Sequence, residues 1–168
     1  MTDYHSHVLP GIDDGSKSAE ETLAMLKALK KQGVDKVYAT PHFDALVDHP
    51  DLFLERRNAA YERIKPLIDG EEYPELLLGA EIMYFSGISD IQSISKLKLE
   101  NTDFLLLEMP IERWSEYMIS EIIKLTLASN IKVMLAHVER YRPLQKRAVF
   151  HKLLSYGILM QSDRKSVV

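Results

Sequence analysis

Short apolar runs alternate along this chain with longer segments in which apolar residues recur every three or four positions. Runs of about four to eight apolar residues indicate buried strands, and the three-to-four spacing indicates amphipathic helices. The predicted strands are residues 2–8, 34–40, 76–81, 104–107, 131–136 and 158–161. The predicted helices are residues 18–32, 51–68, 116–129 and 143–156. This alternation predicts βα units on a parallel sheet or barrel.

Turn and cap residues mark several of these boundaries. Ser16 or Ser18 can cap the first predicted helix, and Gly33 follows its end. Residues 10–16 are rich in proline, glycine and aspartate, which predicts a loop in which Asp13 is a turn residue.

Histidines and acids stand at or just past the ends of the predicted strands. His5 and His7 are separated by one residue, so on an extended strand both imidazoles project from the same face. The other members of this set are His42, Glu81, Glu108 and His137. Parallel α/β proteins place their active sites at the carboxyl ends of their strands, and packing alone gives no reason for acids or imidazoles there. These residues are therefore the candidate ligands of one metal site.

The types of candidate ligand narrow the choice of metal ion. Imidazoles and carboxylates without sulfur suit manganese, iron or zinc. The number of ligands predicts more than one ion, with a carboxylate such as Glu81 bridging two of them.

Composition excludes several other classes of protein. The chain has 168 residues, which fits a single domain over 1–168, and its net charge of −4 gives no basic surface for nucleic acid. No apolar run is long enough to span a bilayer and no signal peptide is visible, so a cytoplasmic protein without membrane insertion is expected. The sequence contains no cysteine, which excludes disulfides and any cysteine nucleophile.

Six short motifs together resemble a known family. They are Asp3 to His7, Leu9 to Gly15, Thr40-Pro41-His42, Gly79 to Ile82, Leu107-Glu108 and Ala136 to Tyr141. In this combination the chain resembles the PHP (polymerase and histidinol phosphatase) superfamily, and within it the manganese-dependent protein-tyrosine phosphatases of bacterial capsule biosynthesis. The resemblance extends from residue 1 to about residue 161.

The resemblance implies a fold and a role for each matching residue. The fold would be a distorted seven-stranded TIM-like (β/α) barrel with two to three ions, most simply Mn²⁺, although Fe or Zn would also fit. His5 and His7 would hold a first ion, with Glu81 bridging to a second ion that Glu108 and His137 complete. Asp14 and His42 would hold the third, and Arg140 would clamp the phosphate, unless Arg140 is only an ion-pair partner of Glu139.

The sequence departs from the family's pattern near its end. The family continues to a late Asp-x-His motif that supplies ligands to two of the three sites, and no histidine follows His151 here. A shortened barrel lacking its last βα units is therefore expected, with Asp163 a weak substitute for the missing carboxylate. A barrel with exposed edge strands would pair with other chains, so a homo-oligomer is also expected.

The predicted function is hydrolysis of phosphotyrosine by metal-bound hydroxide. The resemblance implies that the substrate is the tyrosine-rich tail of a bacterial tyrosine kinase controlling capsular or exopolysaccharide synthesis. Two alternatives stay open: another PHP phosphoesterase, such as a histidinol-phosphate phosphatase or an exonuclease-type domain, and a catalytically impaired fragment that still binds metal.

Some aromatic and histidine residues that could belong to a functional site are more simply explained as packing or surface residues. Trp114, Tyr84 and Phe85 could border a substrate opening, but packing is the commoner role of aromatic residues. His49 and His151 belong to none of the motifs and are expected on the surface.

Overall fold

The computed structural model describes residues 1–68, 70–128 and 131–162 and divides into two compact units. The first unit comprises Met1–Ala80 with Leu99–Asn101, and the second comprises Glu81–Lys98 with the chain from Thr102 onward. Each unit is a small parallel α/β structure, so the α/β class predicted from the sequence is confirmed for both.

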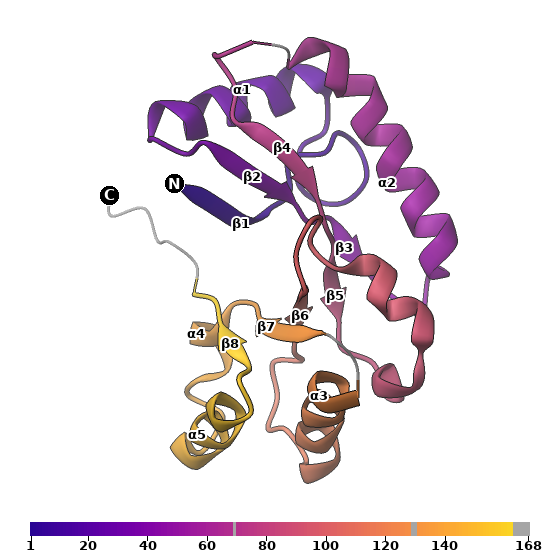
Figure 1. Ribbon diagram of the computed structural model, residues 1–168, viewed down its shortest axis with the longest axis vertical. Coiled ribbons are helices and arrows are strands. Elements are labelled where there is room, and N and C mark those ends of the chain that lie inside the picture. The colour runs from indigo at the N-terminus through magenta and orange to yellow at the C-terminus, as the bar shows by residue number, and fades with distance from the viewer. Residues whose placement is uncertain (69, 129–130, 163–168) are drawn as a thin grey trace. The chain divides into compact units, whose positions relative to one another are not determined.

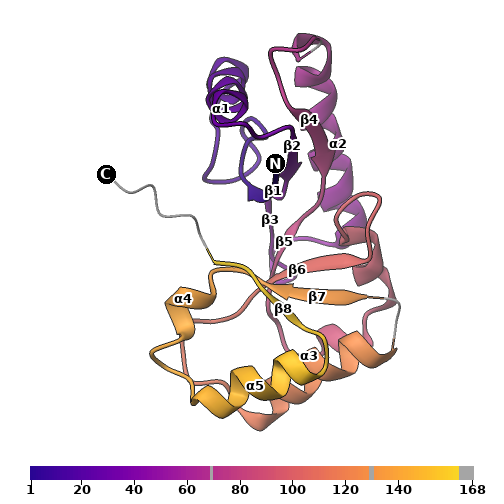
Figure 2. The ribbon, with the colours of Figure 1, turned by 60° about the vertical axis from the view of Figure 1, so that its left-hand side comes forward.

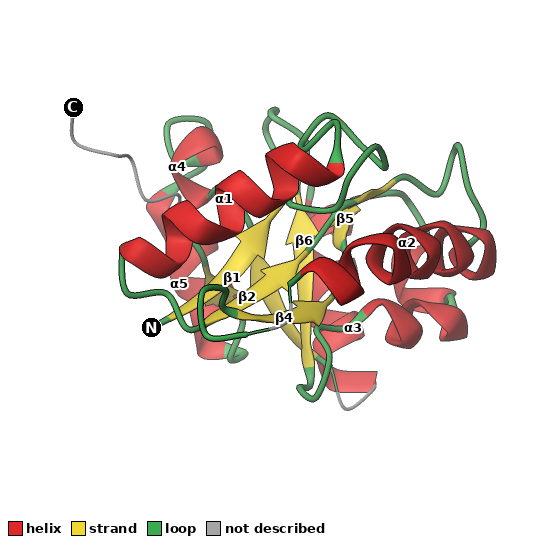
Figure 3. Ribbon diagram, turned by 90° about the horizontal axis from the view of Figure 1, so that it is seen from above, coloured by secondary structure: helices red, strands yellow, loops and turns green. Residues whose placement is uncertain are grey.

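In the first unit the strand order is β1-β2-β4, and both pairings are parallel. The strands are β1 (Thr2–Ser6), β2 (Lys36–Ala39) and β4 (Glu75–Leu78), with a two-residue strand β3 (His42–Phe43) following β2. The helices are α1 (Ala19–Lys31) and α2 (Pro50–Ile64), the latter continued by a 3-10 turn, η1 (Lys65–Leu67). Figure 1 shows β1, β2 and β4 side by side, and Figure 3 shows α1 running along β1 and β2.

Helix α1 forms where its capping residues predict. The Ser18 side chain accepts a hydrogen bond from the backbone N–H of Glu21, while Glu20 and Glu21 occupy the first turn, where the helix dipole favours negative charge. Beyond the helix, Gly33 adopts a left-handed conformation with φ of 80°, which favours glycine.

The core of the first unit lies between its sheet and its two helices. Leu26 of α1, Val37 and Ala39 of β2, and Ile64 of α2 belong to one buried cluster. Val8 and Leu9, which follow β1, are fully buried in the same cluster. The chain is therefore held on both sides of His7, because β1 precedes it and the buried residues Val8 and Leu9 follow it.

In the second unit the strands β5, β6, β7 and β8 lie in that order, and neighbouring strands are parallel. Their bounds are β5 (Glu81–Met83), β6 (Phe104–Glu108), β7 (Lys132–Leu135) and β8 (Leu159–Met160). The helices are α3 (Glu116–Ala128), α4 (Val138–Tyr141) and α5 (Arg147–Ser155), with 3-10 turns η2 (Ile88–Asp90) and η3 (Gln92–Leu97). Figure 2 shows α3 and α5 next to each other along this sheet.

Two sequence predictions need correction, and two short elements were missed. The strand predicted over 76–81 is two strands, because β4 ends at Leu78 and Glu81 begins β5. The strand is interrupted at Gly79, whose carbonyl accepts a hydrogen bond from the buried Arg57 guanidinium at 2.9 Å. A Cβ added at Gly79 would lie 2.4 Å from the Leu99 side chain. The short elements β3 and α4 were not predicted, and the helix expected over 143–156 begins only at Arg147.

Within the described part of the chain, every helix is too short or too polar to cross a membrane.

Candidate functional site

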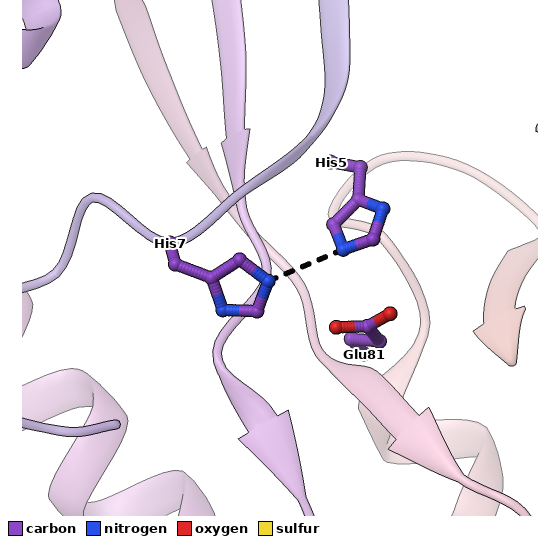
Figure 4. A group of neighbouring side chains, drawn as sticks. All are labelled: His5, His7 and Glu81. Carbon is purple, nitrogen blue, oxygen red and sulfur yellow. Dashed lines mark hydrogen bonds between the residues drawn. The ribbon is translucent and has the colours of Figure 1, made fainter. Parts of the chain in front are cut away.

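The first group of candidate ligands comes from the first unit and starts with the two histidines at β1. His5 lies in β1 and His7 directly follows it. Their Nε2 atoms are 3.2 Å apart (Figure 4), as expected for two imidazoles that project from one face of an extended chain. Glu81, also drawn in Figure 4, is the first residue of β5 and belongs to the second unit.

His42 extends this group from a second element. It is the first residue of β3, and its ring centroid is 4.5 Å from that of His7. Its Nε2 atom lies 3.5 Å from Oδ1 of Asp14, whose side chain is 84% exposed. Potential ligand atoms of His7, Asp14 and His42 all lie within 4.8 Å of one another. This donor set of two imidazoles and one carboxylate fits a divalent transition metal such as Mn²⁺, Fe²⁺ or Zn²⁺.

Asp13 is the residue of this site that the sequence did not identify. It was predicted to be a turn residue, and its Oδ1 does accept the Gly15 N–H at 3.0 Å, as in an ordinary Asx turn. Its Oδ2, however, lies 2.7 Å from Nδ1 of His7 and accepts the backbone N–H of His42 at 3.1 Å. Burial pushes the pKa of Asp13 upward, but the hydrogen bonds from His7, Gly15 and His42 outweigh it, so the pKa lies below its ordinary value.

The second group of candidate ligands belongs to the second unit. Glu81 is fully buried, and its Oε1 lies 2.9 Å from Nε2 of His137. Oε1 of Glu108, the last residue of β6, lies 3.9 Å from the same nitrogen. A fully buried carboxylate needs a cation or a protonated partner, because an isolated buried charge is strongly disfavoured. His137 Nε2 thus lies within 4 Å of two carboxylates, which are nitrogen and oxygen donors of the types that divalent transition metals accept.

The backbone holds His137 in an unusual conformation. It caps α4 with φ of 51°, in the left-handed region that residues other than glycine rarely adopt. Its N–H donates to Oε1 of Gln161 at 3.2 Å, and the Val138 N–H donates to the Gln161 carbonyl at 3.0 Å. The buried Tyr141 hydroxyl donates to the carbonyl of Ala136, the residue before His137. These bonds maintain a strained conformation, which is common at functional sites.

Arg140 lies beside this second group. One of its guanidinium nitrogens is 3.2 Å from Oε1 of Glu108, and its side chain is 43% exposed. The sequence left open an ion pair with Glu139, its neighbour in the chain; the ion pair with Glu108 links Arg140 to the end of β6. Arg140 therefore combines a charge partner in the ligand group with access to solvent.

Three of the remaining residues, Trp114, His49 and His151, behave as their simpler explanations predict. Trp114 is buried and packs on Tyr141, with ring centroids 5.1 Å apart. His49 caps α2, and His151 is an exposed residue of α5. Asp163, the suggested substitute carboxylate, lies outside the described residues.

The fold and these side chains together define a class: parallel α/β proteins that carry imidazoles and carboxylates at or near the ends of their strands. Comparison with known proteins makes the class specific. The family described as capsular polysaccharide synthesis, CpsB/CapC, matches residues 1–168. The chain therefore belongs to the CpsB/CapC family.

Several relatives are tyrosine phosphatases by name. The chain is 30% identical over 165 residues to the tyrosine-protein phosphatase YwqE of Bacillus subtilis, covering 96% of this chain and 63% of that protein. It is 28% identical over 152 residues to the tyrosine-protein phosphatase CpsB of Streptococcus agalactiae, covering 88% of this chain and 60% of the relative.

A solved structure agrees with the sequence comparison. It comes from work on YwqE of Bacillus subtilis and CpsB of Streptococcus pneumoniae, described as unique metal-dependent tyrosine phosphatases. The TM-score is 0.76 at 26% identity, covering 96% of this chain and 66% of that one. The family predicted from the motifs is thus confirmed, and the chain spans somewhat under two thirds of the length of these relatives.

Proposed function

We propose that this chain carries a metal-dependent protein-tyrosine phosphatase site. The observation that supports it most is the His7, Asp14 and His42 group, whose ligand atoms lie within 4.8 Å of one another in a chain that matches the family throughout. The names of the relatives supply the reaction, because YwqE and CpsB are both tyrosine-protein phosphatases.

The proposed ligands are those that the motifs assign. His5, His7, Asp14 and His42 come from the first unit, and Glu81, Glu108 and His137 from the second. We propose two to three ions, most simply Mn²⁺, held by these residues in a barrel of the PHP type. Bound divalent ions would lower the pKa of a coordinated water toward neutrality and neutralise phosphoryl charge.

The protein's own groups have distinct tasks in this proposal. The Arg140 guanidinium, with its planar set of N–H donors, would bind the phosphoryl oxygens and stabilise the charge that spreads over them in the transition state. Glu108 would hold Arg140 in place through the ion pair at 3.2 Å. Because a tyrosine phenolate is a good leaving group, a strong general acid is less important than for an alkyl phosphate.

The substrate that we propose is a phosphotyrosine-bearing tail of a bacterial tyrosine kinase of capsule synthesis. The family's description, capsular polysaccharide synthesis, supports this choice. A cytoplasmic location and a homo-oligomer belong to the same proposal, and size-exclusion chromatography with light scattering would test the latter.

Hydrolysis assays on the purified chain test the function directly. Rates on a phosphotyrosine peptide, histidinol phosphate and a short oligonucleotide would be measured with EDTA, with Mn²⁺ and with Zn²⁺. Metal-dependent turnover of the peptide alone is the expected result, whereas preference for either other substrate would indicate a different phosphoesterase. Metal binding without turnover of any substrate would support the catalytically impaired, metal-binding alternative instead.

A matched pair of histidine variants tests the site. His7→Gln removes a proposed ligand, and His151→Gln removes an exposed histidine of α5. We expect His7→Gln to lower Mn²⁺ affinity by at least about 100-fold, since loss even of an outer-shell partner weakens metal affinity by about 10–100-fold. His151→Gln should bind Mn²⁺ like the parent chain. Equal Mn²⁺ affinities in the two variants would show that His7 is not a ligand.

A further inference from the structure

Asp13 and Asp14 are adjacent in the sequence but lie in opposite environments. The side chain of Asp14 is 84% exposed, whereas that of Asp13 is 6% exposed. A carboxylate is rarely buried to this degree unless several donors compensate for the lost hydration. Asp13 therefore has a task within the protein that ordinary turn chemistry does not explain.

The donors around Asp13 come from three places in the chain. Besides the N–H of Gly15, which completes the local turn, they are Nδ1 of His7 at 2.7 Å and the backbone N–H of His42 at 3.1 Å. The latter two meet at one oxygen, Oδ2. A single carboxylate thus joins the end of β1 to the start of β3, the two elements that carry these histidines.

The loop that carries Asp13 is built around His7. The His7 carbonyl accepts the Ser16 N–H at 3.0 Å, and the Gly11 N–H donates to the Ser16 carbonyl at 2.8 Å. Gly15 packs directly on His7: a Cβ at Gly15 would lie 2.2 Å from the His7 carbonyl oxygen and 2.4 Å from its Cβ. These contacts hold the loop that carries Asp13 against His7.

This arrangement determines which ring nitrogen of His7 carries the proton. An ionised carboxylate can only accept hydrogen bonds, so the proton must be on Nδ1. The lone pair of the ring is then on Nε2, which lies 3.2 Å from Nε2 of His5. Carboxylates commonly orient metal-ligating histidines in this way.

We infer, on the basis of the proposed function, that Asp13 is a positioning residue. It fixes the tautomer and ring orientation of His7 for metal binding and ties His7 to the backbone of His42. Asp13 itself is not a ligand in this inference and acts only through its neighbours.

Asparagine is the informative substitution, because it keeps the size of the side chain but replaces one acceptor by an NH₂ donor. If the NH₂ group takes the Oδ2 position, it faces the His42 N–H and favours the other tautomer of His7. If it takes the Oδ1 position, it faces the Gly15 N–H. Neither orientation satisfies all three donors, so Asp13→Asn must disturb the arrangement. Asp35→Asn is the matched control, because Asp35 is an exposed carboxylate of the same unit that pairs with the N-terminal amine and Lys30.

Two measurements test the inference. In the metal-free parent chain, ¹⁵N-resolved imidazole NMR should find His7 as the Nδ1–H tautomer, with its signals assigned by their loss in His7→Gln. Calorimetry with Mn²⁺ alone should give a dissociation constant about 10–100-fold higher for Asp13→Asn, and no change for Asp35→Asn. A His7 ring protonated mainly on Nε2 would overturn the inference without any Asp13 variant, even if Asp13→Asn failed to fold. An Asp13→Asn affinity within twofold of the parent would also overturn it.

These readouts separate the two proposals. Neither the tautomer nor the Mn²⁺ affinity depends on hydrolysis of a phosphotyrosine peptide. A chain that shows the expected tautomer and Asp13-dependent binding but turns over no phosphotyrosine would refute the proposed function and leave the role of Asp13 intact.

Discussion

Replacing Gly15 by alanine should damage the fold and the metal site together. Ordinary van der Waals contact begins near 3.4 Å, but the new Cβ would lie 2.2 Å from the His7 carbonyl oxygen and 2.4 Å from the His7 Cβ. These atoms belong to the backbone or are fixed to it, so the loop and His7 must separate by roughly 1 Å. The same separation would pull Asp13 away from the His7 ring.

The size of the effect follows from known costs of overpacking. Inserting a methyl group into a closely packed site costs about 1–3 kcal/mol, and the depth of this clash places Gly15→Ala in the upper part of that range. For a chain of this size, a loss of about 2–3 kcal/mol lowers the melting temperature by roughly 4–12 °C.

Thermal unfolding and Mn²⁺ calorimetry on two glycine variants would check this expectation. Gly33→Ala is the control, because Gly33 has φ of 80° but a Cβ at this position would meet no atom of the described residues within 4 Å. It should lose about 1–2 kcal/mol through backbone strain alone and keep the parent's Mn²⁺ affinity. Gly15→Ala should lose both stability and affinity.

Two results would refute the reasoning. An unchanged melting temperature in Gly15→Ala would mean that the loop does not pack on His7 as described. Equal losses of Mn²⁺ affinity in both variants would mean that affinity follows overall stability, not the position of His7.

Two further predictions concern the second unit. Arg140→Lys keeps the charge but loses the planar set of donors, so turnover of a phosphotyrosine peptide should fall about 100-fold with an unchanged melting temperature. The control is Arg142→Lys at a nearby exposed residue, which should retain activity. Equal activity in the two variants would show that Arg140 does not bind the phosphate. The pKa of Tyr84 is raised by burial and by its 2.5 Å hydrogen bond to Glu121. A raised folded-state pKa stabilises the protein below the unfolded value of about 10 and loses that contribution as the pH rises further. Urea midpoints at pH 8 and 10.5 should therefore fall more in the parent than in Tyr84→Phe, and equal falls would contradict this assignment.

The amphipathic and apolar patterns predicted the longer elements well. The helix expected over 18–32 is α1 (Ala19–Lys31), and the strand expected over 104–107 lies within β6 (Phe104–Glu108). The helix is long enough for its period to be visible and carries its own end signals, and the strand is a continuous apolar run. By contrast, β3 has two residues and α4 has four, which is too short for any periodicity.

Residue type and strand position identified the candidate ligands, but not how their chain segments run. Glu81 was expected to end a strand, and instead it begins β5. In the interruption before it, the carbonyl of Gly79 accepts a hydrogen bond from Arg57, which is distant in sequence. Likewise, the left-handed conformation of His137 is maintained partly by Gln161, a residue 24 positions later. Contacts of this kind leave no local pattern in the sequence.

The pair Asp13 and Asp14 shows most clearly what each level of description determines. The sequence by itself determined that the chain is a parallel α/β protein with imidazoles and carboxylates near its strand ends, because periodicity and residue chemistry are local properties. From the sequence alone, the roles of these two identical neighbouring residues cannot be distinguished. Only the folded loop decided that Asp13 is buried against His7 and His42 while Asp14 is exposed, because the direction of a side chain depends on donors supplied by distant parts of the chain.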